Sequence, residues 1–195
     1  LTSTTYSDDF TFHPDSMMTA AREFVIRKQV SGTEFPEVNS EGNRIKWFTK
    51  KEEFYADMVN TPFMMFSNTV ILRGDLLLEP QGLSGEGAMD LVTSAIISDN
   101  FSYGAEKIMA DTSDFRLNSL LSDKLAINTS NVQANIDFDI AKGQFYSNED
   151  FTLVEFPEIV YSSNLDFFEW DIMDESIKMG LNKEIETGES EDGLY

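Results

Sequence analysis

The chain of 195 residues contains no cysteine and a single histidine, His13. Without cysteine, disulfides, thiol nucleophiles and thiolate metal ligands are excluded. A Ser-His-Asp triad needs a histidine that shuttles the proton, and His13 stands in a polar segment directly before Pro14. Metal sites built from several histidines are excluded by the same count. These absences predict a protein without catalysis.

Positive charge is also scarce, and long apolar runs are missing. The chain carries 14 Lys and Arg residues against 35 Asp and Glu residues, which gives a formal net charge of −21. Such a field repels nucleic acid phosphates and anionic lipid headgroups, so nucleic acid is not expected as a partner. No apolar run is long enough to span a membrane. The charge suits a solvated surface, a cationic partner or loosely bound divalent cations.

The two ends of the chain indicate a fragment of a longer protein. The chain opens with Leu1-Thr2-Ser3-Thr4-Thr5, which is mostly polar and lacks an initiator Met, and no signal peptide pattern follows. Residues 183–193 are acidic and polar, which is typical of a linker. We therefore expect a segment of a longer protein. Its predicted parts are an N-terminal mixed segment at 1–62, a repetitive β region at 63–180 and an acidic linker-like tail at 181–195.

The segment from Met17 to Gln29 is the best candidate for a helix. Apolar residues at Met18, Ala21 and Val25 form an approximate helical stripe, and the polar residues after Pro14 could cap its start. The consecutive β-type residues of 24–26 favour a strand in the same place. The sequence thus predicts little helix, confined to the region near the N-terminus.

From Phe63 onwards, short β-type runs alternate with turn residues. Residues 69–78 predict a strand with a bend at Gly74. Residues 82–87 predict a glycine-rich corner, because they lack the Lys-Ser/Thr ending of a phosphate loop. One run alternates with period two, which predicts a strand with one wet face. Its apolar side is formed by Val132, Ala134, Ile136, Phe138 and Ile140.

The β-type runs recur about every 20 to 25 residues, which is in the range of solenoid repeats. No long helices separate them. The predicted fold class is therefore mainly β, with a β-solenoid-like stack of short strands. A β-sandwich or jelly roll would leave similar traces and is the alternative.

Paired carboxylates are the first candidate site. Asp137 and Asp139 are two residues apart, and a strand would place them on one face about 7 Å from each other. Calcium binds several oxygen ligands, so these two residues are weak calcium candidates, although a third acidic or Asn ligand is missing from the loop pattern. No other cofactor is expected. The alternatives are a carboxylate glycosidase, which needs two positioned carboxyl groups, and a solvated strand face.

Aromatic residues near the C-terminus are the second candidate site. Tyr161, Phe167 and Trp170 could stack on a sugar or another ligand. Phe167 and Phe168 should point to opposite faces of a strand, so one of them could be exposed. Packing in the core is the alternative role. A continuous apolar interior would instead suggest a lipid conduit, like the β-bridges that carry lipopolysaccharide.

Seven strings of the chain stand out: PFMMF at 62–66, LRGDLLLEPQGLSGEG at 72–87, SDNFSY at 98–103, ADTSDF at 110–115, GQFYSN at 143–148, VEFP at 154–157 and DFFEW at 166–170. With these strings, the chain resembles large uncharacterised β-repeat proteins of the cell envelope of Bacteroidetes-type bacteria. The resemblance implies a structural or interaction segment that lies outside the cytoplasm, in the periplasm, in the outer membrane or at the cell surface. It implies a protein or envelope component as partner, with lipid or glycan as the alternative, and it carries over no catalytic residue.

Overall fold

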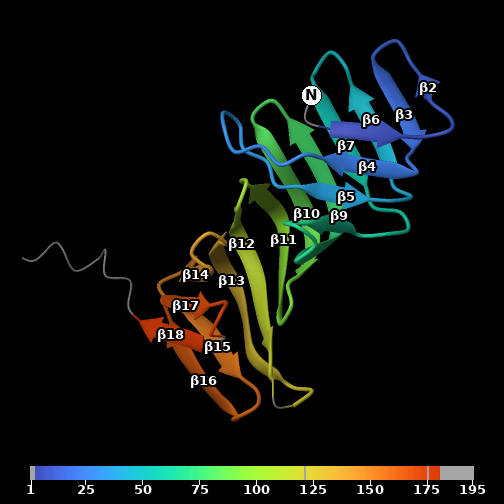
Figure 1. Cartoon of the computed structure of the whole chain (residues 1–195). Coiled ribbons are helices and arrows are strands. Elements are labelled where there is room, and N and C mark those ends of the chain that lie inside the picture. Colours follow the sequence, from blue (N-terminus) through green and yellow to red (C-terminus); the bar gives the residue numbers. More distant parts are fainter. Residues whose placement is uncertain (1–2, 121, 175, 181–195) are drawn as a thin grey trace, which may run out of the picture.

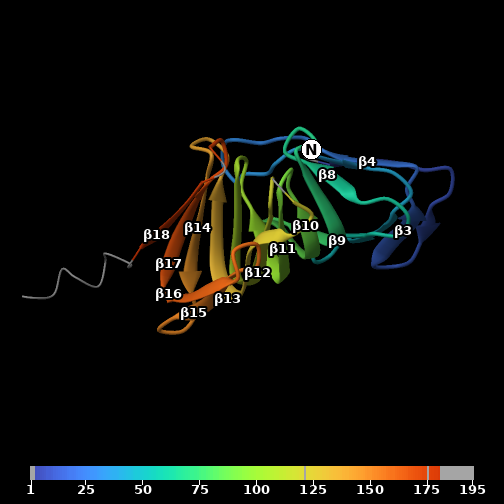
Figure 2. The same ribbon diagram turned by 90° about the horizontal axis from the view of Figure 1, so that it is seen from below.

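The computed structural model describes residues 3–120, 122–174 and 176–180. These residues form eighteen strands that are linked by hydrogen bonds into a single antiparallel sheet, with no helix among them. The molecule is elongated, with its N-terminal strands (blue) at one end and its C-terminal strands (orange and red) at the other (Figures 1 and 2). The prediction of a mainly β fold is confirmed.

The centre of the sheet is a meander of long strands, each of which pairs with the next along the chain. They are β9 (Val70–Glu79), β10 (Gly82–Asp90), β11 (Ser94–Tyr103), β12 (Lys107–Asn118) and β13 (Leu125–Asp137). Their side chains alternate between a buried and a wet face, as at Ile108 and Ala110 beside the exposed Lys107 and Met109. Short turns keep this meander local in sequence.

The sheet divides into two branches at its N-terminal end. The first half of β9 continues into β8 (Phe63–Met65), β5 (Val38–Ser40), β4 (Glu23–Ile26) and β1 (Ser3–Tyr6). The second half continues into β7 (Glu53–Asp57), β6 (Arg44–Phe48), β3 (Ser16–Ala20) and β2 (Thr11–Phe12). The branches pack against each other, because the rings of Phe24 in β4 and Phe54 in β7 stack with centroids 5.5 Å apart.

The C-terminal end repeats this division on β13. Asn128 and Thr129 pair with β15 (Thr152–Phe156), which in turn pairs with β16 (Tyr161–Leu165). The second half of β13 pairs with β14 (Lys142–Ser147), followed by β17 (Phe167–Asp171) and β18 (Ser176–Gly180). The sheet therefore ends in two branches at each end of the meander.

Backbone irregularities mark both points of division. Gly74 lies in β9 between the residues that pair with β8 and those that pair with β7. It is the register partner of Gly87 in β10, and the two backbones are so close that neither position has room for a Cβ. Gly87 also has a φ of +124°, in a region that favours glycine. In β13, Asn131 (φ 56°) separates the residues that pair with β15 from those that pair with β14. At these positions a single strand can bend and pair with two different strands along one edge.

A contiguous apolar cluster runs along the sheet from one pair of branches to the other. In its C-terminal part, the fully buried Phe115 contacts Phe145, Phe168 and Trp170, with ring centroids 4.2, 5.9 and 5.7 Å away. Burial of each such side chain contributes about 1.5 to 3 kcal/mol. The inner face of the meander is therefore filled by side chains.

Several finer predictions are corrected by the structure. The expected helix at 17–29 is wrong: β3 ends at Ala20 and β4 begins at Glu23, because pairing with β6, β1 and β5 favours strands over the approximate helical stripe. Residues 82–87 are the first part of β10, with a register shift at Gly85/Gly87, and not a corner. A solenoid is not shown, since the described strands form one open antiparallel sheet. The predicted tail at 181–195 lies outside the described residues.

Candidate binding surfaces

The carboxylates of Asp137 and Asp139 do not share a strand face. Asp137 is the last residue of β13, and Asp139 lies exposed in the turn that follows. The chain turns here because Ala141 takes a φ of 53°, which also places Ile140, expected on the buried face, in solvent. Val132, Ala134 and Ile136 are buried as predicted.

Asp137 has a cationic partner within the protein. Its Oδ2 lies 3.0 Å from Lys107 Nζ, and its Oδ1 accepts a hydrogen bond of 3.0 Å from the backbone N–H of Asp139. Partial burial acts to raise the pKa of Asp137, but the hydrogen bond and charge of Lys107, with backbone N–H groups, lower it below its ordinary value. Among the described residues, no three His, Cys, Asp or Glu side chains are grouped for a metal ion. The calcium site stays a prediction.

The three aromatic candidates have different surroundings. Trp170 is only 1% exposed and belongs to the core cluster. Phe167 is half-buried and packs on Tyr146 with ring centroids 5.0 Å apart, while Phe168 faces the core, so these two point to opposite faces as expected. Tyr161 is 55% exposed and lies 5.8 Å from the ring of Phe156. Tyr161, Phe167 and Trp170 therefore do not form a common stacking surface.

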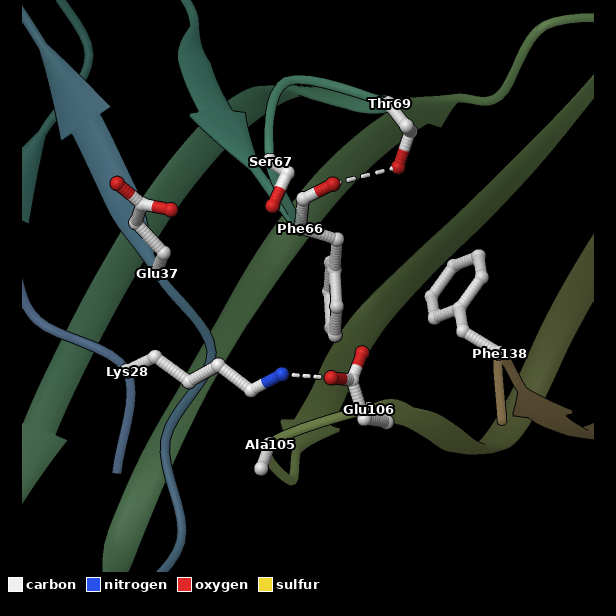
Figure 3. Close-up of a pocket in the computed structure, with 8 residues that line it drawn as sticks. All are labelled: Lys28, Glu37, Phe66, Ser67, Thr69, Ala105, Glu106 and Phe138. Carbon is white, nitrogen blue, oxygen red and sulfur yellow. Dashed lines mark hydrogen bonds and ion pairs between the residues drawn. The ribbon is translucent and has the colours of Figure 1, made fainter. Parts of the chain in front are cut away.

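A small pocket of about 240 Å³ lies where four connections meet at one side of the meander (Figure 3). Lys28 forms an ion pair with Glu106, and the rings of Phe66 and Phe138 lie 4.7 Å apart across the pocket. Phe66 has a left-handed φ of 50°, which is uncommon for a bulky residue, and its carbonyl accepts a hydrogen bond of 2.7 Å from Thr69 Oγ1. These contacts connect the four turns to one another, and the charges of Lys28 and Glu106 at the centre are paired within the protein.

A larger apolar cavity of about 790 Å³ opens at the N-terminal end between the two branches. Its apolar lining consists of Phe10, Met17, Phe35, Trp47, Phe54 and Leu78. Glu52 and Glu79 also line it, so a cationic or neutral group is favoured there over an anionic one. Trp47 is 40% exposed, which leaves an aromatic surface in contact with solvent. The volume is in the range of small-ligand sites.

The hairpin of β6 and β7 concentrates positive charge in an otherwise acidic chain. Arg44, Lys46, Lys50 and Lys51 fall within residues 44–51, a range without any Asp or Glu, and we name this range the basic hairpin. Lys46 Nζ lies 4.5 Å from the centroid of the Phe48 ring, and Lys51 Nζ lies 5.6 Å from it. The exposed positions Lys50 and Lys51 lie at the tip of the hairpin. This surface was not among the predicted sites, although the string RIKWFTKK carries its signal, four basic residues within eight.

The C-terminal branches have the opposite charge and exposed apolar residues. Residues 149–174, which we name the acidic end, contain eight Asp and Glu residues and no Lys or Arg. Glu169 is matched by Lys142, whose Nζ lies 2.6 Å from its Oε1 and whose hydrogen bond lowers the pKa of Glu169. The apolar side chains that face solvent here are Phe151, Leu153, Ile159, Val160, Tyr161 and Met173. This gathering of exposed apolar residues marks a candidate contact surface.

Comparisons bring no relative to these surfaces. No family model, no curated protein and no solved structure matches the chain. None of the described residues belongs to a helix that could cross a membrane. The features that bear on function are therefore the packed sheet, the cavity between the N-terminal branches and the two chemically different ends of the molecule.

Proposed function

We propose that the chain is a non-catalytic structural or interaction segment of a large bacterial cell-envelope protein. One observation carries the proposal: a continuous core supports an elongated sheet whose edge strands all lie at its two ends. Within the described ranges, each of these edge strands pairs on one side only. They are β1, β2, β16 and β18.

An edge strand presents backbone N–H and C=O groups that another strand can pair with. Further units added at these ends would lengthen the sheet without disturbing the core. A long protein built in this way would be a stack of β units. We therefore propose a solenoid-like arrangement for the longer protein. The resemblance to β-repeat proteins of the cell envelope supports the same role.

A second candidate function is the binding of a lipid or glycan, and the cavity between the N-terminal branches favours it. Buried side chains fill the inner face of the meander, so the cavity at this end is the proposed ligand site. Trp47 and Phe10 would contact an acyl chain or the face of a sugar. Native mass spectrometry of the purified chain should then show a bound lipid, and its loss in a Trp47→Ala variant would place the ligand in the cavity.

The main proposal is tested by activity and by location. The purified chain should release no product from glycan and ester substrates. Turnover of either class would contradict the proposal. If the double variant Asp137→Asn/Asp139→Asn then lacked that activity, the turnover would be assigned to a carboxylate mechanism. An antibody against the chain should detect it in envelope fractions of the source cells, and its recovery in the cytosol would contradict the envelope location.

A further inference from the structure

We infer that copies of this fold bind one another head to tail, with the acidic end of one copy on the N-terminal end of the next. This inference rests on the proposed function and names the partner as a second copy of the same chain. The N-terminal end consists of β1, β2, β3 and the basic hairpin. Three properties support this contact: the basic hairpin and the acidic end carry opposite charges, and both surfaces offer exposed apolar side chains and unpaired strand edges.

Charge is the first of these properties. The basic hairpin places four cationic side chains within eight residues, whereas the acidic end has eight carboxylates over 26 residues. Arg44 and Lys51 already lie beside Asp57 and Glu53 of β7, at 3.9 and 3.6 Å, which leaves Lys46 and Lys50 as the cations of the hairpin that are unmatched among the described residues. Two N-terminal ends facing each other would bring Lys50 and Lys51 against their own counterparts, and two acidic ends would repel more strongly. Residues 3–20 at the N-terminal end carry three Asp and no Lys or Arg, so the attraction is confined to the basic hairpin, where only the mixed contact sets opposite charges against each other.

Exposed apolar surface is the second property. At the acidic end, Val160 is 91% exposed at the turn between β15 and β16, next to the exposed Tyr161. At the N-terminal end, Phe12 of β2 is 73% exposed, and the cavity beside Trp47 is open. A contact between the two ends would remove both sets of apolar groups from water, which drives protein association.

Backbone pairing is the third property, and it fits the shape of the molecule. In the described part of the chain, β1 and β2 at the N-terminal end have a partner on one side only, as do β16 in the acidic end and β18 directly after it. The two ends lie at opposite extremes of the elongated sheet (Figures 1 and 2). A contact between unlike ends does not close on itself here, so it would continue into a row of copies.

A charge-swap experiment tests the inference. Sedimentation velocity of the purified chain should show a mean mass that rises with concentration in low salt and less so at about 1 M salt, where charges are screened within about 3 Å. The variants Lys50→Glu/Lys51→Glu and Glu155→Lys/Glu158→Lys should each associate at least about tenfold more weakly. The chain with all four substitutions regains opposite charges at the contact and should associate like the original.

The controls separate a specific contact from a change in net charge or in folding. Arg73→Glu/Arg116→Glu alters the net charge as much as the lysine pair does, but on exposed positions of the central strands, and it should leave association unchanged. Circular dichroism verifies that each variant is folded. A chain that stays monomeric up to about 1 mM, or a folded fourfold variant without recovery, would overturn the inference. Neither result would contradict the proposed function, which is contradicted only by turnover of a substrate or by a cytosolic location.

Discussion

Gly74→Ala is the substitution to which the divided sheet should be most sensitive. A Cβ built at Gly74 would lie 1.8 Å from the carbonyl oxygen of Glu86 and 2.9 Å from the Cα of Gly87. Both neighbours are backbone atoms, so no side chain can turn away to make room. The strands β9 and β10 would have to separate by more than 1 Å at the point where β9 changes partner, or lose their pairing there.

We expect this change to cost about 3 kcal/mol or more, which is the upper range for overpacking of a rigid interior. For a chain of this length that corresponds to a fall of the midpoint of thermal unfolding by about 6 to 12 °C. The reduced entropy of the unfolded chain would offset only about 0.4 to 1 kcal/mol. Urea unfolding followed by circular dichroism measures the free energy, and differential scanning calorimetry measures the midpoint.

Gly82→Ala is the matched control. It lies in the same strand pair, its φ is not positive, and nothing approaches an added Cβ within 4 Å. Its free energy of unfolding should change by no more than about 0.5 kcal/mol. Equal stabilities of the Gly74→Ala and Gly82→Ala variants would refute the close backbone approach of β9 and β10 at Gly74 and with it the explanation of the branching.

Three further predictions concern the core, the two tryptophans and pH. Phe115→Ala removes a fully buried ring from the aromatic cluster and should lower the free energy of unfolding by about 3 to 5 kcal/mol, whereas Val92→Ala at an exposed position should change it by less than about 0.5 kcal/mol in the same urea titration. With Trp47 replaced by Phe, the fluorescence of the remaining Trp170 should resist acrylamide, and efficient quenching would contradict its burial. Burial, followed by the charge of the neighbouring Asp75, raises the pKa of Asp57, so this residue's contribution to stability is lost as the pH rises through that pKa. The free energy of unfolding of the Asp57→Asn variant should therefore match that of the original chain at pH 3 and exceed it at pH 7. A difference that is the same at both pH values would contradict this.

Local patterns were sufficient for the fold class and for several strands. The alternation of Val132, Ala134 and Ile136 predicted the buried face of β13, because the period of a strand is written in consecutive residues. The strand over 69–78 with its bend at Gly74 followed from β-type residues around a glycine. Local patterns misjudged residues 17–29, where a partial helical stripe competed with β-branched residues and distant strands decided the outcome.

The candidate sites show the same limit. The sequence identified Trp170 and Tyr161 as aromatic candidates alike, yet one is fully packed against Phe115 and the other faces solvent. The position of Asp139 depended on where the hairpin after β13 turns, and one residue in a left-handed conformation moved it off the strand. Burial and partners come from contacts between distant segments, which a local pattern does not contain.

The sequence by itself determined the chemical character of this protein: all-β, strongly acidic, without cysteine and with one histidine. Composition and short-range periodicity suffice for these properties, because each depends on single residues or on neighbours. Only the tertiary structure decided that β9 and β13 each serve two partners, and that the basic hairpin and the acidic end lie at opposite extremes of one sheet. Strand pairing is a long-range choice, in which register and bending are set by the core that the whole chain builds together.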